Sequence, residues 1–110
     1  MRAEDAKLVT LARGARGRIS ADAGAALRDD TGRTYSAAEV RLPSLTLTAV
    51  QLAVAQAAAA GARGVEAVVV VSDAPVVEEA SLTCVRDLGG PGVAYLLCDA
   101  AGAVVEEIAT

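Results

Sequence analysis

The sequence contains no histidine, no phenylalanine and no tryptophan, and only two tyrosines and two cysteines among its 110 residues. Without histidine, the chain cannot supply an imidazole ligand to a metal ion. Cys84 and Cys98 are too few to hold a structural zinc ion by themselves. Because the first residues, MRAEDAKLVTL, carry charges and do not form the apolar stretch of a signal peptide, we expect a cytoplasmic protein with both thiols reduced and buried.

Hydrophobic residues make up 54% of the chain, but aromatic residues make up only 2%. The core must therefore be assembled from alanine, valine, leucine and isoleucine, which bury less area per residue than rings do. A chain of this length is expected to form one domain, residues 1–110, with much of its surface exposed in a monomer. We therefore expect further burial through self-association, in a homodimer or homotetramer.

Acidic residues outnumber basic residues, and the formal net charge is -4. On average this charge repels a nucleic-acid backbone or an anionic membrane, so we expect no nucleic acid and no membrane as a partner. The longest apolar region, residues 49–62, is interrupted by Gln51 and Gln56 and is too short to span a bilayer. These features predict a soluble protein.

The first forty residues predict a helix followed by a hairpin. Residues 5–18 place small and apolar side chains at helical spacing and arginines in the last turns, where the helix dipole favours them. Two short strands, 23–27 and 34–40, flank the segment RDDTGR, whose aspartate and glycine residues favour a turn.

The stretch SLTLTAVQLAVAQAAAAGA, residues 44–62, predicts a helix with Ser44 or Thr46 as its N-cap and Gly61 as its stop. This helix is apolar on almost its whole circumference, so we expect it to be buried on all sides. The valine-rich run at residues 65–71 shows no alternation, which is typical of a central strand covered on both faces.

Residues 75–88 predict an amphipathic helix with Ala80 and Val85 facing inward and Glu78 and Glu79 facing outward. Two further strands, residues 93–98 and 103–108, form a second hairpin. The resulting order, αββαβαββ, favours an α/β fold with helices on both faces of a five-stranded mixed sheet, a three-layer α-β-α sandwich.

Three stretches carry a resemblance to a known family. AGAAL followed by DDTGRTY (residues 23–35), LTLTAV (45–50) and ASLTCVRDL (80–88) resemble segments of the cytidine deaminase family, in the same order and at similar spacing. The resemblance covers nearly the whole chain. It implies a zinc-dependent nucleoside deaminase fold and a tetramer in which neighbouring subunits complete each other's pockets.

The resemblance fails at the residues that carry the family's chemistry. Zinc-dependent deamination uses three protein ligands to activate a water molecule, and a glutamate that moves protons. Here Thr48 occupies the first ligand position and Val50 the glutamate position, while Ser81 and Cys84 occupy the remaining pair. Two neutral hydroxyls and one thiol make a poor zinc site, and valine transfers no proton. We therefore expect no catalytic residues, no metal site and no cofactor.

The nucleoside-binding positions differ as well. The family's asparagine and glutamate for the ribose correspond to the stretch EVRL, residues 39–42, and its aromatic ring over the pyrimidine corresponds to Ala21. Glu39 and Arg41 are candidates for a new polar site, although alternating outward side chains of an edge strand explain them equally well. Thr48 could bind an anion together with free helix amides, or it could simply cap the helix.

Two functions remain open from the sequence. The first is a non-catalytic oligomeric scaffold or binding module for an unknown small molecule, a pseudoenzyme of the cytidine deaminase family. The second is a cytidine or deoxycytidine deaminase with a rearranged or weak site that uses Cys84, Asp73 or Glu79.

Overall fold

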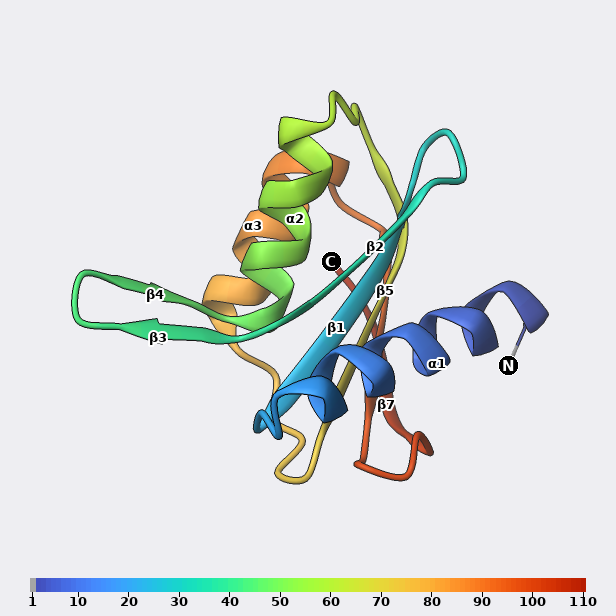
Figure 1. Cartoon of the computed structure of the whole chain (residues 1–110). Helices are drawn as coiled ribbons and strands as arrows, with labels where there is room; N and C mark the ends of the chain where they lie inside the picture. The colour runs from blue at the N-terminus through green and yellow to red at the C-terminus, as the bar shows by residue number, and fades with distance from the viewer. Residues whose placement is uncertain (1) are drawn as a thin grey trace.

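A five-stranded mixed sheet forms the middle layer of the computed structural model, which describes residues 2–110 (Figure 1). The strand order is β2-β1-β5-β6-β7, in which β5 and β6 run parallel and every other neighbouring pair is antiparallel. The strands are β1 (Ala23–Asp29), β2 (Thr34–Ala38), β5 (Val65–Ser72), β6 (Ala94–Cys98) and β7 (Val104–Ala109).

Strand β5 lies at the centre of the sheet because its valines can be buried on both faces. Val68 and Val70 contribute to one hydrophobic cluster, while Val69 and Val71 contribute to a second cluster on the opposite face. The prediction of a doubly covered central strand is confirmed.

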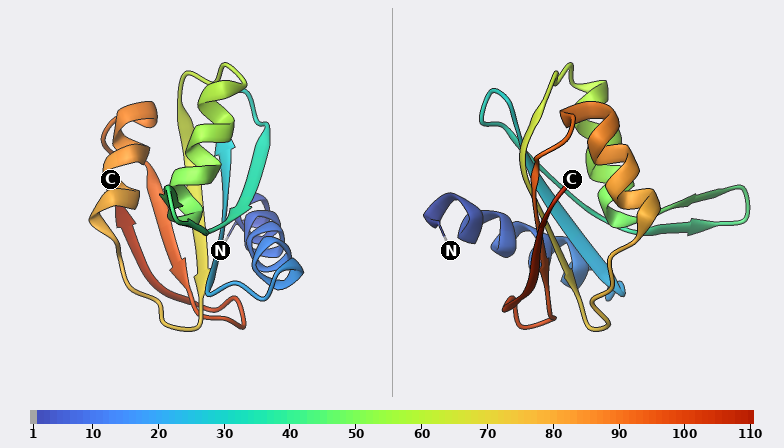
Figure 2. Two further views of the ribbon diagram at one scale, coloured as in Figure 1. Left: turned by 60° about the vertical axis from the view of Figure 1, so that its left-hand side comes forward. Right: turned by 180° about the vertical axis from the view of Figure 1, so that it is seen from behind.

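Three helices cover the two faces of the sheet, as the three-layer prediction required. Helix α1 (Ala3–Arg18) lies on one face, and α2 (Ala49–Ala59) and α3 (Glu79–Gly89) lie side by side on the other (Figure 2). Helix α1 approaches β1 so closely that a Cβ atom at Gly24 would collide with the carbonyl oxygen of Ala12. No helix within residues 2–110 combines the length and apolarity needed to cross a membrane.

The segment before α2 differs from the prediction. Strand β2 ends at Ala38, and the following residues form a separate two-stranded ribbon of β3 (Val40–Leu42) and β4 (Leu45–Leu47), which projects from the body of the molecule (Figure 1). The predicted N-caps, Ser44 and Thr46, are therefore wrong. The alternating sequence LTLT suits a strand, and the helix begins after Thr48 instead.

The start of α3 is also corrected. The helix begins at Glu79 rather than at Pro75, and Ser81 is buried while Ala80 is exposed. The inner face carries Ser81, Leu82 and Val85; Val85 lies four residues after Ser81 and three after Leu82, the spacings at which a helix aligns its side chains.

Within a single chain, helix α2 is buried on one side only, so the predicted burial on all sides would need contacts with other copies of the chain. Ala49, Val50, Ala53, Val54 and Ala57 face the core. The opposite side, with Ala55, Gln56, Ala58 and Ala59, is exposed. Both cysteines are free; Cys98 is buried as predicted, whereas Cys84 is only partly buried.

Candidate functional site

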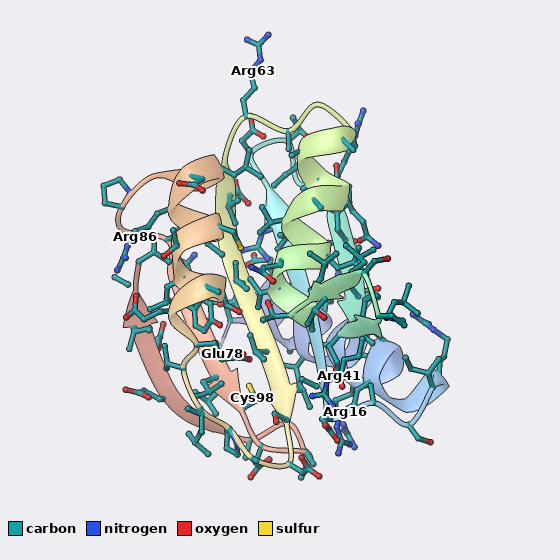
Figure 3. All side chains as sticks on the ribbon, turned by 90° about the vertical axis from the view of Figure 1, so that its left-hand side faces the viewer. Arg16, Arg41, Arg63, Glu78, Arg86 and Cys98 are labelled. Atoms are coloured by element: carbon teal, nitrogen blue, oxygen red, sulfur yellow. The ribbon has the colours of Figure 1, made fainter. Side chains whose placement is uncertain are left out.

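A cavity of about 600 Å³ opens where the start of β1, the β3–β4 ribbon, the first residues of α2 and the segment after β5 meet. Ala23 at the start of β1 pairs with Ser72 at the end of β5, so both strand ends reach the same edge of the sheet. Figure 3 shows Arg16, Arg41 and Glu78 at this end of the molecule. The polar residues that line the cavity are Asp22, Glu39, Arg41, Thr46, Thr48, Ser72, Asp73 and Glu78.

Thr48 lines the cavity and caps α2 at the same time. Its Oγ1 accepts a hydrogen bond from the Gln51 amide at 3.0 Å, and the Thr48 amide donates to Gln51 Oε1 at 2.9 Å. This reciprocal capping box satisfies two amides at the helix start. The capping interpretation of Thr48 is therefore confirmed, and its oxygen is already engaged.

Thr48 and Ser81 meet directly, although 33 residues separate them in the sequence. Thr48 Oγ1 lies 2.8 Å from Ser81 Oγ, and the Ser81 side chain is buried. Val50, at the position of the family's glutamate, packs in the core with 1% of its surface exposed. The structure thus places a hydroxyl pair and an alkyl group where the resemblance implies ligands and a proton-transferring acid.

Cys84 follows on the next turn of α3. Its Sγ donates a hydrogen bond to the Ser81 carbonyl oxygen at 3.2 Å. Burial, followed by the nearby charge of Asp87, raises the pKa of the Cys84 thiol to about 11. The thiol of the metal-free chain therefore keeps its proton at neutral pH, whereas nucleophilic attack requires the thiolate.

These side chains do not fit a zinc ion. Zinc in catalytic sites takes thiolate, imidazole or carboxylate ligands, and here two of the three positions carry neutral hydroxyls that bond to each other. Within residues 2–110, no group of three or more cysteine, aspartate and glutamate side chains is arranged to hold a metal.

The Glu39 side chain binds the backbone amides of Asp22 and Ala23 in the cavity wall. Its carboxylate accepts hydrogen bonds from the Asp22 amide at 2.6 Å and from the Ala23 amide at 3.0 Å. Arg41 Nη1 lies 3.0 Å from Asp22 Oδ2, and both side chains are about two-thirds exposed. Both residues were predicted as site candidates, and both line the cavity.

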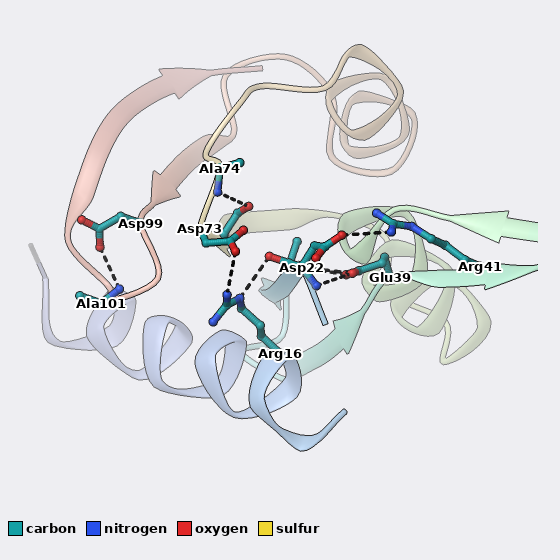
Figure 4. A network of polar contacts seen from close by, with 10 residues as sticks. Arg16, Asp22, Glu39, Arg41, Asp73, Ala74, Asp99 and Ala101 are labelled. Carbon is teal, nitrogen blue, oxygen red and sulfur yellow. Dashed lines mark hydrogen bonds and ion pairs between the residues drawn. The ribbon is translucent and has the colours of Figure 1, made fainter. Parts of the chain in front are cut away.

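A second ion pair joins α1 to the cavity (Figure 4). Arg16 Nη2 lies 3.6 Å from Asp73 Oδ2, and Arg16 Nε donates to the Asp22 carbonyl oxygen at 3.1 Å. Four carboxylates and one arginine line the cavity, so its lining carries a net negative charge. Such a lining favours cationic or hydrogen-bond-donating groups over anions.

The structure brings some of the predicted residues together and separates others. Glu39, Arg41, Thr48 and Asp73 line the cavity. Glu78 lines it in place of Glu79, because the later start of α3 leaves Glu78 as the N-cap residue facing the opening. Sequence reasoning missed Asp22; its position directly after Ala21, which corresponds to the family's aromatic ring, is a signal that could have found it.

Comparisons with known proteins agree with the fold. The family model described as cytidine deaminase-like matches residues 1–102. The structure superimposes on cytidine deaminase from Burkholderia pseudomallei with a TM-score of 0.81 and 26% sequence identity, covering 100% of this chain and 92% of that one. A comparison with curated proteins gives no match.

Two further solved structures show the same fold at lower identity. Cytidine deaminase from Mycobacterium leprae gives a TM-score of 0.71 at 21% identity, with 86% of this chain and 88% of that chain covered. Cytidine deaminase from Mycobacterium tuberculosis gives 0.70 at 21% identity, with 86% and 85% covered. This chain belongs to the cytidine deaminase-like family.

Proposed function

We propose that this chain is a non-catalytic member of its family, a cytoplasmic module that self-associates and binds a small molecule in the cavity. The observation that carries the proposal is the direct contact between Thr48 Oγ1 and Ser81 Oγ, with Val50 buried beside them in the core. Metal-activated water and a proton-transferring acid are the two requirements of zinc-dependent deamination, and these residues supply neither.

The cavity retains the size and polarity of a ligand site. About 600 Å³ is within the range of small-molecule pockets. Arg41 and Asp73 present charged groups at its wall, and apolar residues such as Leu47 and Val70 complete it. These features support binding of a small polar molecule without a reaction.

Self-association is the second part of the proposal. Leu42 and Leu45 on the β3–β4 ribbon are 56% and 47% exposed, and the outer side of α2 carries exposed alanines. A core with few aromatic side chains buries little area within one chain. Burial of these exposed apolar surfaces between copies of the chain would add to it. A homodimer or homotetramer would cover them.

A cytidine or deoxycytidine deaminase with a rearranged site is the alternative. The likeness to the Burkholderia pseudomallei enzyme and the carboxylate of Asp73 in the cavity wall support it. Cys84 supports it less, because its thiol stays protonated at neutral pH, and Glu79 does not line the cavity.

Zinc content and ammonia release test the two functions together. Purified protein supplied with zinc is expected to retain far less than one zinc ion per chain by elemental analysis, and to release no ammonia from cytidine or deoxycytidine. One zinc ion per chain would contradict the non-catalytic proposal, and ammonia release that Cys84→Ser abolishes would establish the alternative. Thermal-shift measurements with nucleosides and small amines then test binding in the cavity, with a rise in Tm expected for a bound compound.

A further inference from the structure

Two hydroxyl groups join α2 to α3 at the point where both helices begin. We propose that the Thr48–Ser81 pair, called here the hydroxyl clasp, fixes the two helix starts against each other and makes their packing independent of any metal ion. The 2.8 Å contact between the two oxygens is the observation that carries this inference.

Thr48 is held rigidly on its own side of the clasp. The capping box with Gln51 uses both the Thr48 amide and the Thr48 hydroxyl, which fixes the rotamer of the side chain. A side chain fixed in this way presents its oxygen to Ser81 at little further cost in conformational entropy.

Ser81 is held from the opposite side. Its side chain is 2% exposed and lies near Tyr95, a tyrosine on β6 that is 1% exposed. Burial raises the pKa of the Tyr95 phenol to about 12, and the neighbouring Ser81 side chain partly opposes this rise. The Thr48–Ser81 contact therefore connects the cavity wall to the core.

Removing the Thr48 oxygen takes from the buried Ser81 hydroxyl its contact across the clasp, whereas removing the Ser81 oxygen leaves Thr48 only its bond from the Gln51 amide. A buried polar group that loses its partner destabilises the folded state more than the simultaneous loss of both partners does. The two residues are therefore expected to behave as one energetically coupled unit rather than as two independent side chains.

The clasp explains how the family fold persists with side chains that do not fit zinc. A metal ion bound by residues of two helices both links the helices and activates water. Here the Thr48–Ser81 hydrogen bond links the helices and activates no water. This inference does not require that the cavity bind a ligand, so it goes beyond the proposed function.

Urea unfolding of five variants, one of them a control, tests the clasp. Thr48→Ala and Ser81→Ala are each expected to lower the urea midpoint, and the double variant is expected to lower it by clearly less than the sum of the two shifts. Thr48→Ser, which keeps the hydroxyl, should retain most of the wild-type midpoint. Thr83→Ala, at an exposed threonine of the same helix, is the matched control and should change the midpoint little.

Shifts of the urea midpoint that add up in the double variant would contradict the proposed clasp. A chelator that lowers the urea midpoint of the wild-type protein would also contradict it. If Thr48→Ala does not fold, Thr48→Val, which keeps the branched shape but removes the hydroxyl, replaces it in the same cycle. Failure of small molecules to bind the cavity would contradict the proposed function and leave the clasp standing, so the two failures are distinguishable.

Discussion

At the scale of single residues, Asp29 shows how one buried carboxylate organises a turn. Its Oδ1 accepts hydrogen bonds from the Thr31 amide, the Thr31 hydroxyl and the Arg33 amide, at 2.8, 2.8 and 3.0 Å. Its Oδ2 accepts one from Tyr35 at 2.9 Å. The segment was predicted as a turn because aspartate and glycine favour one, but a bond to a tyrosine six residues away is not visible in the sequence.

The pH dependence of stability follows from this carboxylate. Burial alone would raise the pKa of Asp29, but the hydrogen bonds from Thr31, Tyr35 and Arg33 outweigh it and lower the pKa. A lowered folded-state pKa contributes stability above the unfolded value of about 3.9, and this stability is lost as the pH falls through the folded-state value.

Asp29→Asn is therefore expected to destabilise the protein at neutral pH, because the amide cannot accept all four bonds. The difference in unfolding free energy from the wild type should shrink as the pH falls below the unfolded-state pKa of about 3.9 and through the lower folded-state pKa, where the folded carboxylate becomes protonated. Urea unfolding at several pH values measures this difference. A difference that stays constant with pH would contradict the role assigned to the charge.

At the scale of elements, helices and strands with long, uniform residue patterns were predictable from the sequence, whereas the short strands β3 and β4 were not. The valine run of β5 and the hairpins at both ends of the sheet were found because their residue types agree with their positions. The β3–β4 ribbon was missed because three-residue strands give little periodicity, and the apolar sequence that follows continues without a break into α2.

The packing of α1 on the sheet depends on the missing side chain of Gly24. Gly24→Ala is expected to cost about 1–3 kcal/mol in unfolding free energy, because the new methyl group meets backbone atoms of α1 that cannot rotate away. Gly14→Ala, on the exposed side of the same helix with open space around it, is the control and should stabilise by about 0.5–1 kcal/mol through helix propensity. Thermal or urea unfolding compares the two, and equal effects would rule out close packing as the cause.

At the scale of the whole molecule, the sequence predicted the layered fold but not the ionic network of the cavity. Asp73 lies far along the chain from Arg16 and Asp22, and it meets Arg16 only because the end of β5 lies beside the start of β1. Such contacts follow from topology and from exact strand register, which residue patterns do not specify.

The proposed self-association is expected to depend on the apolar ribbon. The wild-type chain of 11.0 kDa should elute as a dimer or tetramer when light scattering is combined with size exclusion, and a variant combining Leu42→Ser with Leu45→Ser should shift toward the monomer. Ile19→Ser, at a residue 66% exposed after α1, serves as the control and should leave the mass unchanged. A monomeric wild type would refute this part of the proposal.

The central place of β5 also sets an order of events during synthesis. The hairpin of β1 and β2 can form from residues 23–38 alone, but the inner edge of β1 stays unpaired until residues 65–72 have left the ribosome. An open strand edge is a template for pairing with other chains. The nascent protein is therefore most prone to aggregation while β5 is still being made, and the β6–β7 hairpin completes the sheet only after this interval.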